Sequence, residues 1–269
     1  MIVALQYHEG DLEQTMALAR LLADLEARPR GDVILALVCQ PGTPKTPLVE
    51  ATIAHCRRKL EVEWHESPLG ALGHPAGCTA LWTGTAMLYR TGRREHRSIF
   101  MLDGGDGIPL HRDWIDLAKH QHEITLAQGK LITGTPYFLG TCPLHVNPNA
   151  IFEVRIFEET RLLTDVPRHD GTLATHFDIY HREIMLDWTR PSSIVRTDWR
   201  GGGEALTSDL LRERARESIW LHGHKDRRLY FLAREHCLSS PPAPTIKEYD
   251  LFRLRLQEQI RRSYEEASR

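Results

Sequence analysis

The sequence lacks several features that would place a chain in a familiar class at once. Its five cysteines are odd in number and contain no CxxC pair, which argues against a disulfide framework and against a cysteine-bound zinc site. Neither sign of charge dominates, since 34 Lys and Arg accompany 36 Asp and Glu, so a generally basic nucleic-acid binder is not indicated. The longest apolar run, near residues 33–39, is far shorter than the ~20 residues that cross a bilayer.

The start of the sequence, MIVALQY, has no basic n-region and no cleavage site of small residues. We therefore expect no signal peptide. Without a membrane span or a leader, the expected location is the cytoplasm, which would be the host cytoplasm if a phage encodes the protein.

Common nucleotide and hydrolase motifs are missing as well. There is no phosphate-binding GxxxxGK[ST] loop, and no GxGxxG follows the first apolar run, where a dinucleotide fold would need it. A GxSxG nucleophile elbow and an HExxH zinc motif are also absent. These absences argue against a P-loop enzyme, a dinucleotide-dependent dehydrogenase, an α/β-hydrolase and a zinc peptidase.

What the first half contains is an alternation of strand and helix patterns. Apolar runs typical of buried strands cover 2–6, 32–39 and 98–102, and 61–65 alternates like an edge strand. Helical spacing covers 11–26, 48–60 and 78–90. This order predicts parallel βαβ units. In the second half, 131–136 is a candidate strand, 149–157 suits a helix or a strand, and 247–269 is an amphipathic helix.

Polar residues follow two of the predicted strands. Residues 6–9 (QYHE) lie at the end of the strand predicted at 2–6. The segment from Asp103 to Asp106 (DGGD) follows the strand predicted at 98–102. In parallel α/β sheets the ligand crevice lies beyond the carboxyl ends of the strands. Two neighbouring carboxylates favour a divalent cation such as Mg²⁺ or Mn²⁺, which also binds substrate phosphates. The alternative is an aspartate turn that only caps the next helix.

A second chemical segment lies late in the chain, where the apolar run of IWLHGHKD (residues 219–226) leads into His222, His224 and Lys225. An imidazole here can complete a metal site, and the lysine can reach a diphosphate. Alone, this string is equally typical of a buried structural histidine.

Together these segments resemble the GT-A class of nucleotide-sugar-dependent glycosyltransferases. The order of MIVALQY, GHPAGCTALW (73–82), FMLDGGDGIPL (100–110), HVNPNAIF (145–152) and LHGHKD (221–226) is similar to that family's order, over about residues 1–235. The resemblance implies an α/β fold, GT-A-like and Rossmann-related, with a mixed, mostly parallel sheet flanked by helices. It also implies a divalent metal, Mn²⁺ or Mg²⁺, and a nucleotide-sugar donor, with a UDP-sugar as the first candidate.

The resemblance assigns roles to the metal-site residues. The acidic motif is one residue wider than the family's DxD, and alignment to the following proline makes Asp106 the better direct ligand. Asp103 would bind the metal, a metal-bound water or the ribose. His222 is the metal-binding histidine, with His224 left as an alternative.

Donor and acceptor roles follow in the same way. Gln6 and Tyr7 are expected at the nucleobase, with Tyr7 stacking on it, and Lys225 is expected at the diphosphate. The remaining donor-binding residues are Pro75, Gly77 and Gly104, and the segment HVNPNAIF is expected to face the sugar or the acceptor. The three glycines of the acidic loop are also expected to let the backbone come close to a ligand. In an inverting mechanism the catalytic base is expected to be Asp178, with Asp187 and Glu153 as alternatives.

The predicted domain organisation is one catalytic domain, 1–238, with a nucleotide-binding half (1–110) and an acceptor-side half (111–238). Residues 239–269 would form a proline-rich linker and a terminal helix. The expected acceptor is a saccharide or glycan hydroxyl, or else a hydroxymethylated pyrimidine in DNA, a phage-type modification. For DNA, the candidate phosphate contacts are Arg93, Arg94, Arg97, Arg212, Arg214, Arg216, Arg227 and Arg228. The alternative functions are a nucleotidyltransferase and a non-catalytic nucleotide-binding module.

Overall fold

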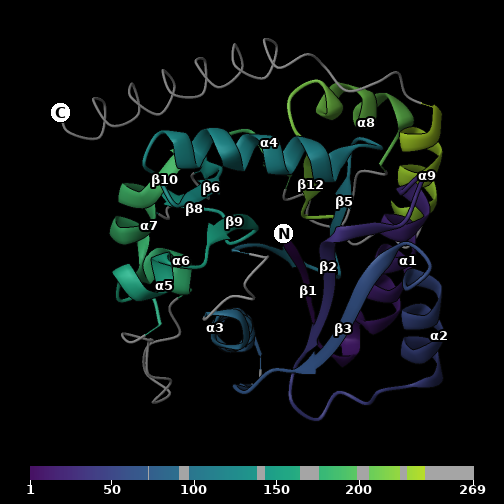
Figure 1. Ribbon diagram of the computed structural model, residues 1–269, viewed down its shortest axis with the longest axis horizontal. Helices are drawn as coiled ribbons and strands as arrows, with labels where there is room; N and C mark the ends of the chain where they lie inside the picture. The colour runs from purple at the N-terminus through teal and green to yellow at the C-terminus, as the bar shows by residue number, and fades with distance from the viewer. Residues whose placement is uncertain are drawn as a thin grey trace.

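The computed structural model describes residues 1–71, 73–90, 97–137, 143–163, 176–198, 206–224 and 229–239. Within these residues, seven strands form the main sheet in the order β10-β6-β9-β4-β1-β2-β3 (Figure 1). Their bounds are β1 (Ile2–Tyr7), β2 (Arg30–Cys39), β3 (Leu60–Glu66), β4 (Ser98–Asp103), β6 (Ile132–Gly134), β9 (Ala150–Glu153) and β10 (Thr189–Pro191).

Two smaller sheets accompany the main one. One has the order β11-β12-β5, and the other pairs β7 with β8. Their bounds are β5 (Gly107–Pro109), β7 (Pro136–Tyr137), β8 (His145–Val146), β11 (Val195–Thr197) and β12 (Trp220–His222).

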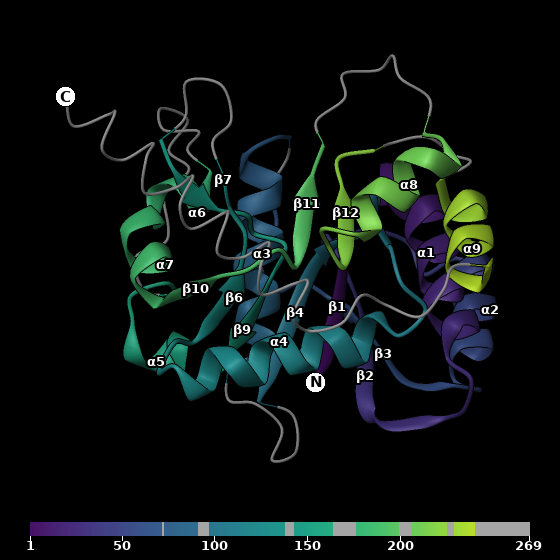
Figure 2. The same ribbon diagram turned by 90° about the horizontal axis from the view of Figure 1, so that it is seen from above.

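Helices cover both faces of the main sheet. They are η1 (Glu9–Asp11), α1 (Leu12–Leu25), α2 (Pro47–Cys56), α3 (Ala76–Tyr89), α4 (Trp114–Ala127), α5 (Ile156–Glu159), α6 (Phe177–Tyr180), α7 (Arg182–Trp188), α8 (Ser208–Ala215) and α9 (Leu229–Ser239). Figure 2 shows α1, α2 and α9 gathered at one end of the molecule and α5 to α7 at the other. None of the described helices is long and apolar enough to cross a membrane.

The main sheet is mixed but mostly parallel. Strands β4, β1, β2 and β3 pair in parallel, as do β10 and β6, whereas β9 is antiparallel to both β4 and β6. The predicted fold class is therefore confirmed. The parallel half also has the predicted order, because each apolar run became a strand and each segment with helical spacing became a helix.

Alternation along β1 separates two hydrophobic cores. Val3, Leu5 and Tyr7 pack with α1, α2 and α9, while Ile2 and Ala4 pack with α3 and the helices of the second half. Successive side chains of a strand point to opposite faces, so the direction of every residue at the sheet edge follows from this parity. Gln6 therefore belongs to the α3 side, and Tyr7 belongs to the α1 side.

The second half is more finely divided than its sequence pattern indicates. The candidate strand at 131–136 is two strands, β6 and β7, which are separated at Thr135. The ambiguous segment 149–157 is both a strand and a helix, since β9 is followed at once by α5. The expected helix at 247–269 and the linker before it lie outside the described residues.

Candidate metal and donor site

The candidate site begins where β1 and β4 end side by side. In the parallel register of these strands Gln6 is the partner of Asp103, and Gly104 N donates a hydrogen bond to Gln6 O at 2.9 Å. Gln6 is 7% exposed, and its side-chain amide contacts the sulfur of Met101. The first polar cluster and the acidic loop therefore meet at the carboxyl edge of the sheet, as the βαβ pattern predicts.

The glycines of the acidic loop make room for protein side chains. A Cβ on Gly104 would lie 2.5 Å from Thr15 atoms, and one on Gly105 would lie 2.7 Å from Asp11. Gly104 O also accepts a hydrogen bond from the Tyr230 hydroxyl at 3.2 Å. These glycines therefore allow the close approach of Asp11 and of helix α1, and the contact of Gly104 with the donor stays a prediction.

The histidine reaches the acidic loop through a small antiparallel pairing. Strand β12 pairs with β5 so that His222 lies opposite Gly107, the residue after Asp106. Beyond β12 the chain turns at Gly223, whose φ of +99° favours glycine. The backbone N–H groups of Gly223 and His224 both donate to Asp106 O, at 3.0 and 3.2 Å. These bonds fix the end of β12 against the acidic loop.

Asp103, Asp106 and His222 form a group whose donor atoms all lie within 4.8 Å of one another. His222 Nε2 lies 3.3 Å from Asp103 Oδ2 and 3.2 Å from Asp106 Oδ1. The side chains of Asp106 and His222 are buried, while that of Asp103 is 45% exposed and opens the group to solvent. Two carboxylates and one imidazole fit a divalent cation of the Mn²⁺ or Mg²⁺ kind.

The electrostatics of the group agree with that fit. Burial alone would lower the pKa of His222, but the charges and hydrogen bonds of Asp106 and Asp103 raise that pKa to about 10. The two acids therefore attract positive charge strongly enough to overcome desolvation. A divalent cation would supply that charge in place of the imidazole proton.

His224 lies outside this group. It is 5% exposed and two residues beyond His222, yet the cluster of possible metal ligands among the described residues contains only His222 of the two. Strand β12 ends at His222, and the chain turns at Gly223 before it reaches His224.

Three residues that the sequence patterns did not single out individually support the group. Asn149 Oδ1 accepts a hydrogen bond from Asp103 N at 2.7 Å, and Asn147 donates from Nδ2 to Thr197 Oγ1. Thr197 Oγ1 lies 3.5 Å from His222 Nδ1. The segment HVNPNAIF was expected to face the sugar or the acceptor. Instead, both asparagines are at most 2% exposed and bond within the protein.

Tyr7 does not present its ring to the site. It is 1% exposed, it belongs to the core beneath α1 and α2, and its hydroxyl accepts a hydrogen bond from Trp64 Nε1 at 3.0 Å. In this arrangement no ring face is available for stacking with a nucleobase. The parity of β1 could have revealed this, because Tyr7 alternates in step with Val3 and Leu5.

Pro75 and Gly77 lie at the start of helix α3. Pro75 is its N-cap residue, and the N–H of Gly77 donates to Gly73 O at 2.6 Å. A Cβ on Gly77 would lie 2.7 Å from the side-chain amide of Gln40, the residue after β2. Both residues are therefore near the carboxyl edge of the sheet, while Lys225 lies outside the described residues.

Asp178 is buried beside a histidine. Its Oδ2 lies 3.5 Å from His145 Nε2, and its Oδ1 accepts a hydrogen bond from Ile179 N. His145 Nδ1 is 2.7 Å from Pro143 O, so both ends of this pair have protein partners. Burial raises the pKa of Asp178, and the charges of His145 and His176 oppose this rise only in part.

The two alternatives to Asp178 lie elsewhere. Glu153 pairs across the sheet with Ser98, at the opposite end of β4 from Asp103, and contacts buried His122. Asp187 is exposed on α7. Neither residue lies at the carboxyl edge of β4, where the acidic group is located.

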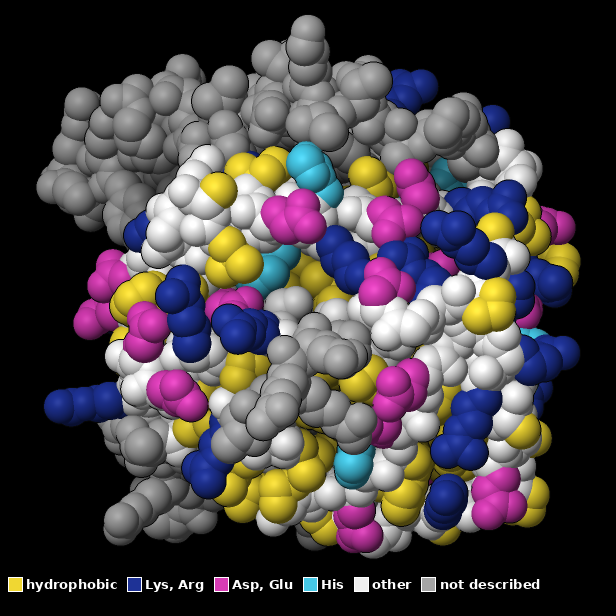
Figure 3. Space-filling view, in the orientation of Figure 1, with side chains coloured by type: hydrophobic (Ala, Val, Ile, Leu, Met, Phe, Trp, Pro, Cys, Tyr) yellow, Lys and Arg dark blue, Asp and Glu magenta, His cyan; other side chains and the backbone are white. Residues whose placement is uncertain are grey.

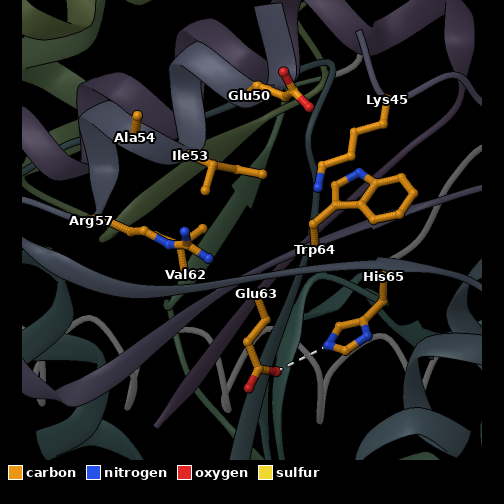
Figure 4. A pocket seen from close by; sticks show the side chains of 9 residues that line it. All are labelled: Lys45, Glu50, Ile53, Ala54, Arg57, Val62, Glu63, Trp64 and His65. Carbon is orange, nitrogen blue, oxygen red and sulfur yellow. Dashed lines mark hydrogen bonds and ion pairs between the residues drawn. The ribbon is translucent and has the colours of Figure 1, made fainter. Parts of the chain in front are cut away.

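A pocket of about 560 Å³ lies apart from this site, along the edge strand β3 and helix α2 (Figure 4). Trp64 forms part of its wall, with Lys45 Nζ 5.2 Å from the ring centre, and a Glu63–His65 ion pair lies at its other side. None of the residues that line it belongs to the acidic group.

No protein-family model and no curated protein matches this chain. Solved structures do match it. Mouse xyloside xylosyltransferase 1, in its apo form, aligns with a TM-score of 0.52 and 13% identity, over 83% of this chain and 98% of that one. The galactosyltransferase LgtC, solved with donor and acceptor sugar analogues, aligns with a TM-score of 0.50 and 10% identity, over 90% and 98% of the two chains.

At such low identities the likeness establishes the fold. The chain has the fold of GT-A glycosyltransferases, over nearly the whole length of both neighbours. The resemblance expected from the order of its segments is thus confirmed as a likeness of architecture.

Proposed function

We propose that the protein is a metal-dependent glycosyltransferase, which moves a sugar from a nucleotide-sugar donor to an acceptor hydroxyl. The observation that carries the proposal is the convergence of Asp103, Asp106 and His222 at the carboxyl edge of a glycosyltransferase fold. In open α/β sheets this edge is the place where ligands bind.

Each residue of the site has a proposed role in binding the metal ion or the donor. Asp106 and His222 would hold a Mn²⁺ or Mg²⁺ ion from the buried side, and Asp103 would approach it from the solvent side. When bound, the ion supplies Lewis-acid neutralisation of the departing diphosphate. Gln6 would contact the nucleotide from the end of β1, and Lys225 would add a positive charge at the diphosphate.

Pro75 and Gly77 would complete the donor site from the start of α3, with a UDP-sugar as the first donor to test. Support comes from their place beside Gln40, at the end of β2. The base-stacking role of Tyr7 is not part of this proposal, because its ring is enclosed by the core.

For acceptor activation we propose Asp178, in the case of an inverting reaction. A raised pKa brings a carboxyl group closer to neutral pH, where a general base works best. His145, 3.5 Å away, would stabilise the charged form during proton transfer. A retaining reaction needs no such base. Because Asp178 is not a member of the cation group, the Asp178→Asn variant tests this assignment independently of the metal site.

A saccharide hydroxyl is the acceptor that we favour over modified DNA. Arg212 pairs with Asp209, and Arg214 pairs with Asp198 and Glu213, so both guanidinium groups are already neutralised. On the described part of the face seen in Figure 3, acidic side chains lie among the basic ones and interrupt any basic stripe. Binding to a DNA backbone normally uses such a stripe. Arg93, Arg94, Arg227 and Arg228 lie outside the described residues.

The first test is a thermal-shift panel of nucleoside diphosphates and sugar nucleotides, each with and without Mn²⁺. A ligand at 100 times its dissociation constant stabilises the native state by about 2.7 kcal/mol, which raises the midpoint of unfolding visibly. The proposal expects a shift that requires both Mn²⁺ and the nucleotide, and no shift with any nucleotide would contradict it.

Turnover then separates the alternative functions. Release of nucleoside diphosphate in the presence of a saccharide supports the glycosyltransferase with a saccharide acceptor. Release only with hydroxymethylated DNA would show that the acceptor is modified DNA. Release of pyrophosphate from a nucleoside triphosphate would indicate a nucleotidyltransferase. Metal-dependent binding without any turnover would indicate a nucleotide-binding module.

A further inference from the structure

The asparagines of the segment HVNPNAIF and one threonine form a closed chain of contacts behind the acidic group. The chain runs from Asp103 through Asn149, Asn147 and Thr197 to His222, which itself contacts Asp103. Both asparagines are buried, at 0% and 2% exposure. Buried amides keep a fixed geometry when each of their polar atoms has a partner.

The orientation of each side-chain amide is fixed by one backbone N–H group. Asp103 N can only donate, so the atom of Asn149 that lies 2.7 Å from it is the carbonyl oxygen. Asn149 Nδ2 is thereby turned toward Asp103 Oδ2, at 3.4 Å. In the same way, Asn149 N donates to Asn147 Oδ1 at 2.8 Å. Asn147 Nδ2 is therefore the atom that faces Thr197, and its hydrogen bond occupies one lone pair of the threonine hydroxyl.

Strand pairing places that hydroxyl against the imidazole. Thr197 and His222 are direct partners in the parallel register of β11 and β12, and Asp198 N donates to His222 O at 2.9 Å. Thr197 Oγ1 lies 3.5 Å from His222 Nδ1, so its remaining lone pair can accept a hydrogen bond from an N–H there. When His222 carries its proton on Nδ1, that N–H can donate to the Thr197 hydroxyl. The lone pair of Nε2 then faces Asp103 and Asp106.

From this geometry we infer that Asn147, Asn149 and Thr197 are positioning residues for the cation site. They keep the His222 proton on Nδ1, so that Nε2 is available to a metal, and they hold Asp103 at the distance that His222 requires. The inference rests on the proposed function, because it concerns the same cation. Histidines that bind metals generally donate their second ring N–H to such a partner, and loss of the partner costs about 10- to 100-fold in metal affinity.

The test measures Mn²⁺ binding to the donor-free protein by calorimetry, so it does not depend on catalysis. Thr197→Val keeps the shape of the side chain and removes the hydroxyl, and we expect Mn²⁺ binding to weaken about 10- to 100-fold. Thr197→Ser restores the hydroxyl and should bind Mn²⁺ nearly as the wild type does. Thr189→Val is the matched control, because Thr189 lies in another strand, β10, and its hydroxyl bonds to Met185 O in helix α7.

A double-mutant cycle tests the chain as a unit. If Asn147 acts through Thr197, the Asn147→Ala, Thr197→Val double variant should bind Mn²⁺ about as weakly as the weaker of the two single variants. The thermal midpoint of the metal-free Thr197→Val protein should fall no further than that of Thr189→Val, which separates positioning from a general loss of stability.

The outcomes distinguish this inference from the proposed function. If the wild type binds Mn²⁺ and Thr197→Val binds it equally well, the positioning role is wrong while the metal site remains. If Thr189→Val weakens binding as much as Thr197→Val does, the effect is not specific to the chain, and the inference is again overturned. If the wild type binds no Mn²⁺ with or without a sugar nucleotide, the cation site itself falls, and the inference with it.

Discussion

Two buried pairings of aspartate with histidine occur among the residues that the structure describes, and they differ in their number of carboxylates. At the end of β4 and β12, two aspartates approach one imidazole, and one of them is 45% exposed. Near α6, a single aspartate meets His145, and both side chains are at most 6% exposed. The first group has two carboxylates for one imidazole and one solvent-exposed member, whereas the second has one carboxylate for one imidazole.

The charged form of the shifted residue is favoured in the first pairing and disfavoured in the second. In the first group the acids raise the pKa of His222 to about 10, although burial opposes this. In the second, burial raises the pKa of Asp178 more than His145 lowers it. An acidic cluster that attracts positive charge suits a cation, and a carboxyl group whose pKa is raised suits proton transfer. The difference teaches that the balance of charges, more than residue type, separates the two roles.

The largest effect is expected at Asp106. Asp106→Ala removes a buried ligand, and we expect metal-dependent transfer from the donor to fall below detection while the fold is retained. A steady-state assay of nucleoside diphosphate release measures this, with circular dichroism as the check on folding. Asp187→Ala, on the surface of α7, is the matched control. Full activity of Asp106→Ala would remove the argument for the metal site.

The second effect concerns the Asp178 pair. For an inverting reaction, Asp178→Asn should lower kcat about 100- to 10,000-fold, because a general base contributes about that much. Mn²⁺ affinity should stay at the wild-type value, since Asp178 is not a member of the cation group. Undiminished kcat together with retained anomeric configuration in the product would show that no base is needed there.

The two histidines of LHGHKD sharpen the comparison further. His222→Ala should weaken Mn²⁺ binding by at least about 100-fold. This exceeds the loss expected for a residue, such as Thr197, that only hydrogen-bonds to a metal ligand. His224→Ala should change Mn²⁺ affinity far less, because His224 is not a member of the cation group. Calorimetric titration of both variants decides the matter, and the reverse ranking would move the ligand two residues along the chain.

The smallest effect is a dependence of stability on pH. The pKa of Asp178 is raised above its ordinary value of 3.8, so the folded state holds this proton after the unfolded state has released it. The free energy of unfolding of the wild type should therefore fall, relative to Asp178→Asn, as the pH rises above about 4. Urea unfolding of both proteins between pH 4 and 7 measures the difference. Parallel curves would contradict the assignment of a raised pKa.

Much of the parallel half was predictable from the sequence. Runs such as VILALVC (33–39) are apolar on every residue because both faces of the strand are covered. The position of the acidic loop follows from where the run at 98–102 ends. The positions of Asp103 and Asp106 in the site were therefore predictable as well. The proximity of Gln6 follows from the parallel register of β1 and β4.

The rest of the site depends on short elements that leave little pattern in a sequence. Strands β5, β11 and β12 have three residues each, too few to show a period, yet they bring His222 and Thr197 to the acidic loop. Asn147 and Asn149 look like ligand-facing amides in the sequence, and only their burial identifies them as internal. The glycines of the acidic loop were expected to admit a ligand, but they admit helix α1. The domain boundaries at 110 and 238 stay a prediction.

The central claim is that Asp103, Asp106 and His222 bind a divalent cation together with a nucleotide sugar. Its most direct test is the thermal midpoint of the wild type and of Asp106→Asn with a UDP-sugar, measured with and without Mn²⁺. The account predicts a raised midpoint for the wild type only when both ligands are present, and no such shift for Asp106→Asn. An equal shift in both proteins, or one that does not need Mn²⁺, would contradict it.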